Sequence, residues 1–187
     1  MNRPTDPPLP KEAMVPTRDP EITPATAADL AAITDIYAHY VTGSVATFDE
    51  TPPDVDHWRQ RLADLTGRGL PFLVARVDGL VAGYAYAGPY RPKPAYRHTV
   101  EDTIYLAPGR AGQGLGRALL GALLPAARSA GARQMVAVIA DTGSDASAAL
   151  HRRFGFVEVG RLVGVGYKHD RWIDTVLMQR DLSAGPA

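Results

Sequence analysis

The sequence contains no cysteine among its 187 residues, which excludes disulfide bridges, zinc–thiolate sites and cysteine nucleophiles. It also lacks an excess of either charge, because 20 Lys and Arg balance 20 Asp and Glu. A chain without a basic field has no general attraction for a nucleic acid backbone or an anionic membrane, so we expect neither as a partner. The five histidines, at positions 39, 57, 98, 151 and 169, do not have the spacing of metal ligands, and we expect no metal.

Long hydrophobic runs are missing as well. None reaches the roughly 18 residues that cross a bilayer, and the first twenty residues lack the apolar centre of a signal peptide. Those twenty residues include six prolines, so we expect a disordered tail over residues 1–20. The remaining length suits a single domain over residues 21–182, followed by a flexible end at 183–187, in a cytoplasmic protein.

Hydrophobic spacing predicts the helices and strands. Helices are expected at 27–40, from Asp54 to Leu65, at 115–129 and at 145–154. An interior proline costs about 3 kcal/mol, so Pro125 should kink or shorten the third helix. Strands are expected near 22–24 and at 72–77, 80–87, 99–106, 135–139, 157–165 and 173–180, with a hairpin turn at Asp78-Gly79. Hairpins in the first half and strand–helix–strand–helix after them indicate a mixed α+β sheet.

The most informative segment is Arg110-Ala111-Gly112-Gln113-Gly114-Leu115-Gly116-Arg117, between a predicted strand and a predicted helix. Alternating glycines allow several backbone N–H groups to face one point, and a helix N-terminus adds about half a positive charge. No acid occurs between Asp102 and Asp141. The segment therefore predicts a phosphate site, although a glycine-rich turn without a ligand stays open. It is neither a Walker loop nor a dinucleotide fingerprint, which needs an acid about 20 residues further on.

Together with this loop, four further segments have the order and spacing of a known family. They are Thr47-Phe48, Thr99-Val100-Glu101, Leu150-His151, and Val165-Gly166-Tyr167-Lys168 with Arg171-Trp172-Ile173-Asp174. Over residues 21–182 the chain resembles the GNAT superfamily of N-acetyltransferases, and within it the phosphinothricin and methionine sulfoximine/sulfone N-acetyltransferases. The resemblance implies a mostly antiparallel sheet of about seven strands with about four helices on both faces. It also implies a homodimer, acetyl-CoA as co-substrate and a small amino-acid-like amine as acceptor.

The resemblance assigns the coenzyme site residue by residue. The diphosphate is expected on the loop amides of Gly112, Gln113, Gly114, Leu115, Gly116 and Arg117. The pantetheine arm is expected along the backbone of Ile104, Tyr105 and Leu106, with Ser144 and Arg153 as further contacts. Two positions depart from the family pattern, since Ala111 stands where Arg or Gln is usual and Ser144 where Asn is usual. The shorter side chains reach less far toward the coenzyme.

Glu101 is the candidate general base. Strand alternation places it on one face with Thr103 and Tyr105, where partial burial should raise its pKa toward neutrality. A carboxylate in water at a strand end remains the alternative. The resemblance implies a catalytic partner at His151, which its helix position equally allows to be a core histidine. Tyr105 is a candidate general acid, and without cysteine the simplest scheme is direct transfer to the amine.

The acceptor site is expected around the loop before that strand. By resemblance, Arg91 and Lys93 face the substrate's acidic groups, Phe48 and Tyr96 form apolar walls, and Glu101 and Thr103 line the floor. Two cations favour an acceptor with a carboxylate and a phosphinate or sulfone over a cationic one. A solvated basic loop is the alternative. Polyamine, aminoglycoside or peptide N-terminal acceptors, and a non-catalytic acyl-CoA-binding module, also remain open.

Overall fold

The structure is a computed structural model that describes residues 20–183. One sheet contains seven strands in the order β1-β2-β3-β4-β5-β7-β6. The strands are β1 (Glu21–Pro24), β2 (Phe72–Val77), β3 (Leu80–Pro89), β4 (Thr99–Leu106), β5 (Gln134–Ala140), β6 (Val157–Lys168) and β7 (Arg171–Asp181). Among these neighbours β4 and β5 run parallel and the others antiparallel, which confirms a mixed, mostly antiparallel α+β sheet. Apart from Pro20 and Ser183, the expected tail at 1–20 and flexible end at 183–187 lie outside the described residues.

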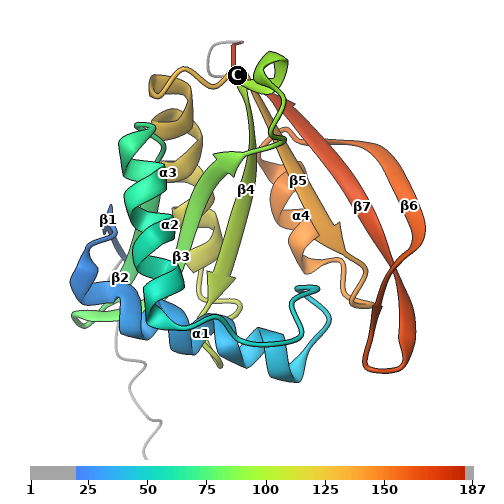
Figure 1. The fold of residues 1–187 in the computed structure, drawn as a ribbon, viewed down its shortest axis with the longest axis horizontal. Coiled ribbons are helices and arrows are strands. Elements are labelled where there is room, and N and C mark those ends of the chain that lie inside the picture. Colours follow the sequence, from blue (N-terminus) through green and yellow to red (C-terminus); the bar gives the residue numbers. More distant parts are fainter. Residues whose placement is uncertain (1–19, 184–187) are drawn as a thin grey trace, which may run out of the picture.

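Helices cover both faces of the sheet, as Figure 1 shows. The helices α1 (Leu30–Gly43) and α2 (Val55–Gly67) lie on one face, while α3 (Leu115–Ser129) and α4 (Ala146–Arg153) lie on the other. Each face has its own hydrophobic core. Leu30, Ile33 and Trp58 belong to the first, and Leu119 and Met135 to the second. The helix–sheet–helix sandwich therefore buries both surfaces of the strands in the N-terminal half.

The first helix begins later than its hydrophobic pattern predicts. Residues Ala27–Asp29 form a 3₁₀ turn, and α1 starts at Leu30 and continues to Gly43. The Asp29 carboxylate accepts hydrogen bonds from both the N–H and the hydroxyl of Thr26, each at 2.9 Å, and it pairs with Arg76 at 2.6 Å. The predicted helix at 27–40 was thus wrong at both ends: a capping box holds its first turn in tighter geometry, and at the other end the helix continues past Tyr40 to Gly43.

The third helix is not shortened by its proline. Helix α3 runs from Leu115 to Ser129 with Pro125 inside it. Its stripe of buried leucines, at positions 119, 120, 123 and 124, packs against the sheet. Packing of this stripe outweighs the roughly 3 kcal/mol that an interior proline costs, so the expectation of a shortened helix was wrong.

The last two strands form a longer hairpin than predicted. Their pairing reaches Lys168 and Arg171, across a turn at His169 and Asp170. Both turn residues have positive φ, at 50° and 57°, which is the geometry of a two-residue hairpin turn that continues the strand twist. Within the described residues, no helix has the length and apolar character needed to cross a membrane.

Candidate active site

The central strands β4 and β5 separate in the middle of the sheet. They pair over three positions, from Thr99 opposite Gln134 to Glu101 opposite Val136, although both continue beyond these residues. Figure 1 shows the two strands diverging below this point. The pairing between these two central strands thus ends at Glu101.

The backbone of β4 presents hydrogen-bonding groups to this widening side. The N–H of Ala107 bonds to Ala82 on β3, and bonding direction alternates along an antiparallel ladder. The backbone groups of Ile104 and Leu106 therefore face away from β3, whereas those of Tyr105 face β3. The carbonyl of Leu106 accepts a hydrogen bond from the Tyr40 hydroxyl at 2.8 Å, which leaves the Leu106 N–H on the widening side. The sequence placed all three along the coenzyme. The structure leaves the Tyr105 backbone engaged with β3, so only its side chain remains a candidate.

The glycine loop lies at the end of β4 and leads into α3, as predicted. Gly112 and Gly114 have φ of 78° and 80°, a backbone region that favours glycine. Gly114 is the N-cap of α3, whose first turn contains no acidic residue. Leu115 buries its side chain in the core, which leaves its amide as the group available to a ligand. The loop therefore combines free-facing amides with a helix N-terminus, the arrangement that binds phosphate.

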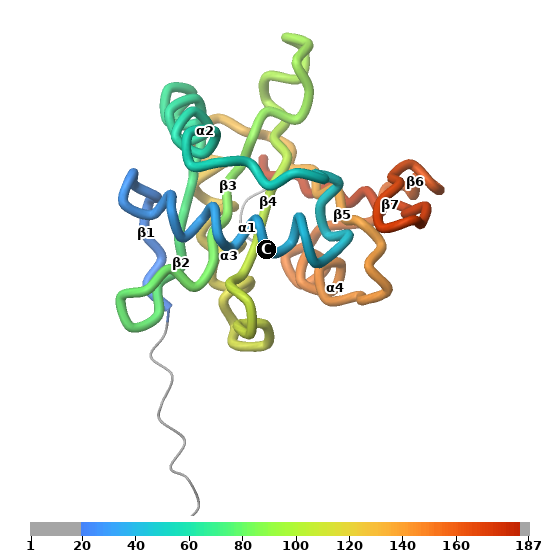
Figure 2. Tube along the Cα trace, turned by 60° about the horizontal axis from the view of Figure 1, so that its bottom comes forward, coloured from blue at the N-terminus to red at the C-terminus, as the bar shows by residue number. Residues whose placement is uncertain are grey.

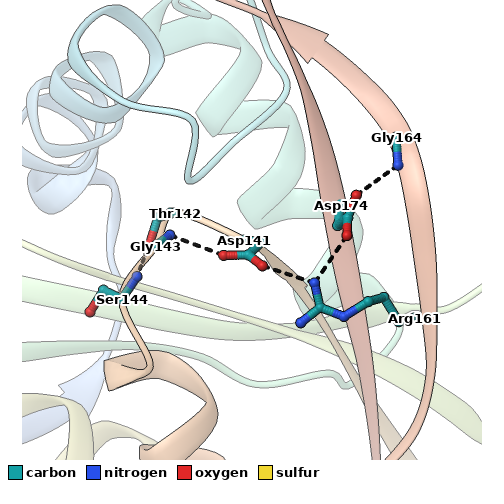
Figure 3. A network of polar contacts seen from close by, with 7 residues as sticks. All are labelled: Asp141, Thr142, Gly143, Ser144, Arg161, Gly164 and Asp174. Atoms are coloured by element: carbon teal, nitrogen blue, oxygen red, sulfur yellow. Dashed lines mark hydrogen bonds and ion pairs between the residues drawn. The ribbon is translucent and has the colours of Figure 1, made fainter.

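A second loop, at residues 141–145, precedes α4 and is fixed to the β6–β7 hairpin. Figure 3 shows the Asp141 carboxylate accepting from the Gly143 N–H at 3.0 Å and from Arg161 at 2.8 Å. The same guanidinium reaches Asp174 at 3.0 Å, and Asp174 accepts from the Gly164 N–H at 2.8 Å. The hydrogen bond from Arg161 is the largest cause of a lowered pKa at Asp141. The loop is thus held to the hairpin by a charged network.

Two expected coenzyme contacts lie on or beside α4. The Ser144 hydroxyl accepts from the N–H of Ala146 at 3.3 Å, so it caps the start of the helix. Arg153 is exposed in the last turn of α4, and Arg117 is exposed in the first turn of α3. Both arginines are therefore accessible to an anion.

Glu101 lies partly buried on the α1/α2 face of β4. Burial raises the pKa of its carboxyl, the charge of Asp102 raises it further, and the charge of Arg91 opposes both. The predicted direction of the pKa is confirmed. A carboxylate whose pKa is raised binds a proton more readily, which is a property that a general base needs.

Tyr105 projects from the same face, toward α1. Its hydroxyl donates to the carbonyl of Ala46 at 3.2 Å, and its ring packs against Tyr37 and Tyr40 at 5.1 and 4.9 Å. Burial raises the pKa of Tyr105 well above its ordinary value, so the hydroxyl keeps its proton at neutral pH.

The predicted substrate residues lie on β4 itself, on the loop before it and, for Phe48, on the loop after α1. Figure 2 shows the loop before β4 projecting at one end and the glycine loop at the other. Arg91 lies over the Tyr90 ring at 5.1 Å, and Tyr96 contacts the same ring edge-on at 5.7 Å. Lys93 is exposed beside them, and the Tyr96 side chain is 39% exposed. An open hollow beside these residues is lined by Tyr90, Tyr96, Thr99, Val136, Leu177 and Gln179.

His151 does not join Glu101. Its Nε2 lies 2.9 Å from the carboxylate of Asp102, and its Nδ1 lies 2.7 Å from the carbonyl of Ser147. Because Asp102 follows Glu101 directly in β4, the two side chains point to opposite faces of the sheet. Of the two readings that the sequence left open, the geometry matches a buried histidine with both ring nitrogens engaged.

Throughout residues 20–183, no group of three or more His, Cys, Asp or Glu side chains is arranged to hold a metal ion.

Residues 31–156 match the acetyltransferase (GNAT) family. The chain belongs to this family. A phosphinothricin N-acetyltransferase of Alcaligenes faecalis is 52% identical over 157 residues, 84% of this chain and 80% of that protein. An L-methionine sulfoximine/L-methionine sulfone acetyltransferase of Salmonella typhimurium is 40% identical over 161 residues, 84% of this chain and 92% of that protein. The crystal structure of a GNAT superfamily phosphinothricin acetyltransferase from Sinorhizobium meliloti in complex with acetyl-CoA has a TM-score of 0.84 at 44% identity, covering 90% of this chain and 94% of that one.

In this GNAT chain, sequence reasoning missed two charged residues. Asp102 is buried against His151, and Lys168 is buried at the end of β6 with its amine 2.9 Å from the carbonyl of Thr47. A signal for Lys168 was present, because this residue ends the segment Val165-Gly166-Tyr167-Lys168, whose order and spacing resemble the family. No comparable signal pointed to Asp102. An acidic residue in a predicted strand is expected to be solvent-exposed unless its neighbours in the fold are known.

Proposed function

We propose that this GNAT chain transfers an acetyl group from acetyl-CoA to the amine of a small amino-acid-like molecule, of the phosphinothricin or methionine sulfoximine/sulfone type. The observation that carries the proposal is the position of Glu101, at the last pair of β4 and β5. The glycine loop lies at one end of β4 and the Arg91 loop at the other. The names of the similar proteins support the same donor and acceptor class.

The residues present fit acetyl-CoA. Gly112 and Gly114 hold positive φ and leave open space where a Cβ would stand, so no other side chain crowds the loop at these two positions. We propose that the diphosphate lies on the amides of Gly112, Gln113, Gly114, Leu115, Gly116 and Arg117. Ile104 and Leu106 would bind the pantetheine arm through their backbone, with Ser144 and Arg153 as outer contacts. When bound, acetyl-CoA supplies an acyl group activated as a thioester.

Glu101 then has the task of removing a proton from the acceptor ammonium. An α-amine with pKa about 8 needs about 1.4 kcal/mol to become neutral at pH 7, whereas a lysine-like amine needs about 4.6 kcal/mol. A single partly buried carboxylate can therefore deprotonate the α-amine of an amino acid at a lower free-energy cost than a lysine-like amine. Tyr105 keeps its proton at Oη on the same face, which makes it the candidate general acid, and Thr103 lines the strand between them.

The acceptor's anionic groups would meet Arg91 and Lys93, and its side chain would lie between Phe48 and Tyr96. These two aromatic residues are each 39% exposed, so both have surface to offer a ligand. The paired cations disfavour polyamine and aminoglycoside acceptors by repulsion.

We also propose that the enzyme is a cytoplasmic homodimer. On the Glu101 face no helix lies in front of β5, β7 and β6 (Figure 1). Val138, Val157, Val159 and Leu162 are 41–62% exposed there, beside the hollow at Tyr96. A contiguous apolar patch next to a binding site is typical of an interface. Sedimentation velocity should show a dimer, and Val157→Asp with Val159→Asp should convert it to monomer. A wild-type monomer at micromolar concentration would refute this part.

The function is tested by following thiol release from acetyl-CoA with a panel of amines. Phosphinothricin, methionine sulfone and methionine sulfoximine should stimulate release, whereas spermidine, kanamycin and an alanyl peptide should not. If only spermidine, kanamycin or the alanyl peptide stimulated release, the proposed acceptor class would be wrong. Tight acetyl-CoA binding by calorimetry without turnover on any amine would instead select the non-catalytic binding module.

A further inference from the structure

An aspartate and a histidine form a buried pair behind the candidate base. The side chains of Asp102 and His151 are 3% and 5% exposed, and their closest atoms are 2.9 Å apart. Phe156 packs edge-on against the imidazole at 4.9 Å. The second carboxylate oxygen of Asp102 is buried without a hydrogen-bond partner. His151 is therefore the group that compensates this carboxylate inside the protein.

The hydrogen bonds of His151 define its protonation. A backbone carbonyl can only accept, so Nδ1 donates its proton to Ser147. The other nitrogen faces the Asp102 carboxylate, which also accepts. Burial lowers the pKa of His151, but the hydrogen bond and the charge of Asp102 outweigh burial and raise it overall. With both nitrogens donating, the ring has no lone pair with which to take a proton from a substrate.

The pair connects two elements at the point where the sheet opens. Asp102 belongs to β4 and directly follows Glu101, the last residue of β4 that pairs with β5. His151 belongs to α4, which begins at the loop that carries Ser144. The contact therefore joins β4 to α4 where β5 no longer pairs with β4. This buried contact fixes to each other the two elements that would flank the pantetheine arm.

We propose that Asp102 and His151 are positioning residues, which hold α4 against β4 and thereby set the geometry of the coenzyme opening. The inference rests on the proposed function for its ligand, acetyl-CoA. It assigns no chemical step to His151, and the base remains Glu101 on the opposite face of β4. Asp102 is the charged residue that faces the imidazole, while Ser147 and Phe156 contribute a carbonyl and a ring edge.

Three variants separate positioning from catalysis. His151→Ala removes the contact, His151→Gln keeps an N–H donor near the position of Nε2 but cannot act as a base, and His57→Ala is a control at an exposed histidine. Calorimetry should show that His151→Ala weakens acetyl-CoA binding roughly tenfold, since displaced elements bind poorly. His151→Gln should restore affinity and kcat to within about threefold of wild type, as should the control.

Two results would overturn the proposal. One is an acetyl-CoA affinity that is unchanged in His151→Ala. The other is a loss of kcat by about 10²–10⁴ in both His151 variants at unchanged affinity, which is the signature of a general base. Circular dichroism would establish that each variant is folded. If His151→Ala does not fold, Asp102→Ala, which removes the oxygen that faces the imidazole, takes its place in the calorimetry, with the same weakening expected and an unchanged affinity again refuting the proposal.

A further readout needs neither coenzyme nor acceptor. Nitrogen NMR of the wild-type imidazole should find both His151 nitrogens protonated at pH 7. A free lone pair on either nitrogen would refute the proposal. Because this spectrum and the acetyl-CoA affinity are measured without an amine, a wrong acceptor class would leave the inference standing.

Discussion

The buried amine of Lys168 donates a hydrogen bond to the backbone carbonyl of Thr47 at 2.9 Å, across 121 positions of the sequence. The Thr47 hydroxyl also lies 2.7 Å from the Tyr37 hydroxyl, which donates to Asp49 at 2.8 Å. These contacts fix the loop after α1 from both sides. This loop carries Phe48. The Thr47-Phe48 segment and the segment that ends at Lys168, each of which resembles the family, are therefore in contact and form one wall of the candidate acceptor site.

Lys168→Met should loosen that wall. Methionine keeps the volume of the side chain but leaves the buried carbonyl of Thr47 without its donor, which costs about 1–3 kcal/mol of unfolding free energy. The KM for the acceptor should rise severalfold, while the affinity for acetyl-CoA stays unchanged. Urea unfolding and steady-state kinetics measure both effects. Arg68→Met, which removes an exposed ion pair with Asp64, is the control and should change stability by less than about 0.5 kcal/mol. Equal effects of the two variants would contradict this role of Lys168.

Gly166→Ala should displace Phe48. A Cβ at position 166 would lie 2.3–2.8 Å from three ring carbons of Phe48, closer than side-chain carbons approach. We expect kcat/KM for the acceptor to fall at least tenfold, an effect of about 1.4 kcal/mol on transition-state binding. In the Phe48→Ala background the same change should have little effect, because the clashing ring is gone. Gly160→Ala on the same strand meets no atom within 4 Å and should behave as wild type. Additive effects of Gly166→Ala and Phe48→Ala would disprove the contact.

Much of the fold could be predicted because local signals and tertiary packing agree. The glycine loop, the Asp78-Gly79 turn and the cap at Asp54 have strong local chemistry, and each lies where the sequence placed it. The 3₁₀ start of the first helix could not be predicted, nor could the effect of Pro125, although α3 has the predicted bounds of 115–129. A capping box tightens that start, and packing of a leucine stripe overrides Pro125 in α3.

The position of a candidate site residue could be predicted only where it follows from the strand or loop that contains the residue. Alternation along β4 was enough to place Glu101 and to give the direction of its pKa. The partners of His151 and Lys168 come from segments 49 and 121 positions away, so no local pattern could reveal them. The divergence of β4 from β5 is likewise a property of the whole sheet.

Glu101→Gln should separate activity from stability. Removing the general base should lower kcat by about 10²–10⁴. In the wild type, activity should fall as the pH drops through the raised pKa of Glu101, because protonation removes the base. A raised folded-state pKa means that ionised Glu101 destabilises the native state above that pKa, so the variant should unfold at an equal or higher temperature at pH 8. Exposed Glu158→Gln should change neither property, and full activity of Glu101→Gln would exclude the assigned base.

Gly114→Ala should weaken coenzyme binding. Gly114 has φ of 80°, where alanine is strained by about 1–2 kcal/mol, so the N-cap of α3 must rotate its amides. The dissociation constant for acetyl-CoA should rise tenfold or more, with a smaller loss of thermal stability. Gly67→Ala, at a glycine near the end of α2 with no atom within 4 Å, should bind the coenzyme normally and be as stable as wild type or slightly more so. Normal affinity in Gly114→Ala would place the diphosphate elsewhere.

The Asp102–His151 pair should also contribute to stability in a pH-dependent way. The folded-state pKa of His151 lies above its ordinary value of 6.5, despite burial, because Asp102 stabilises the imidazolium. A raised folded-state pKa gives stability that is complete below the unfolded value and is lost as the pH rises through the folded value. The difference in unfolding free energy between wild type and His151→Gln should therefore be largest near pH 6. It should shrink above that pH by at most about 1.4 kcal/mol per pH unit.

Glu101 titrates in both proteins, so its contribution cancels in the difference. Urea titrations from pH 5.5 to 9 measure the curve, and a difference that grows with pH would mean that the imidazole is buried in its neutral form.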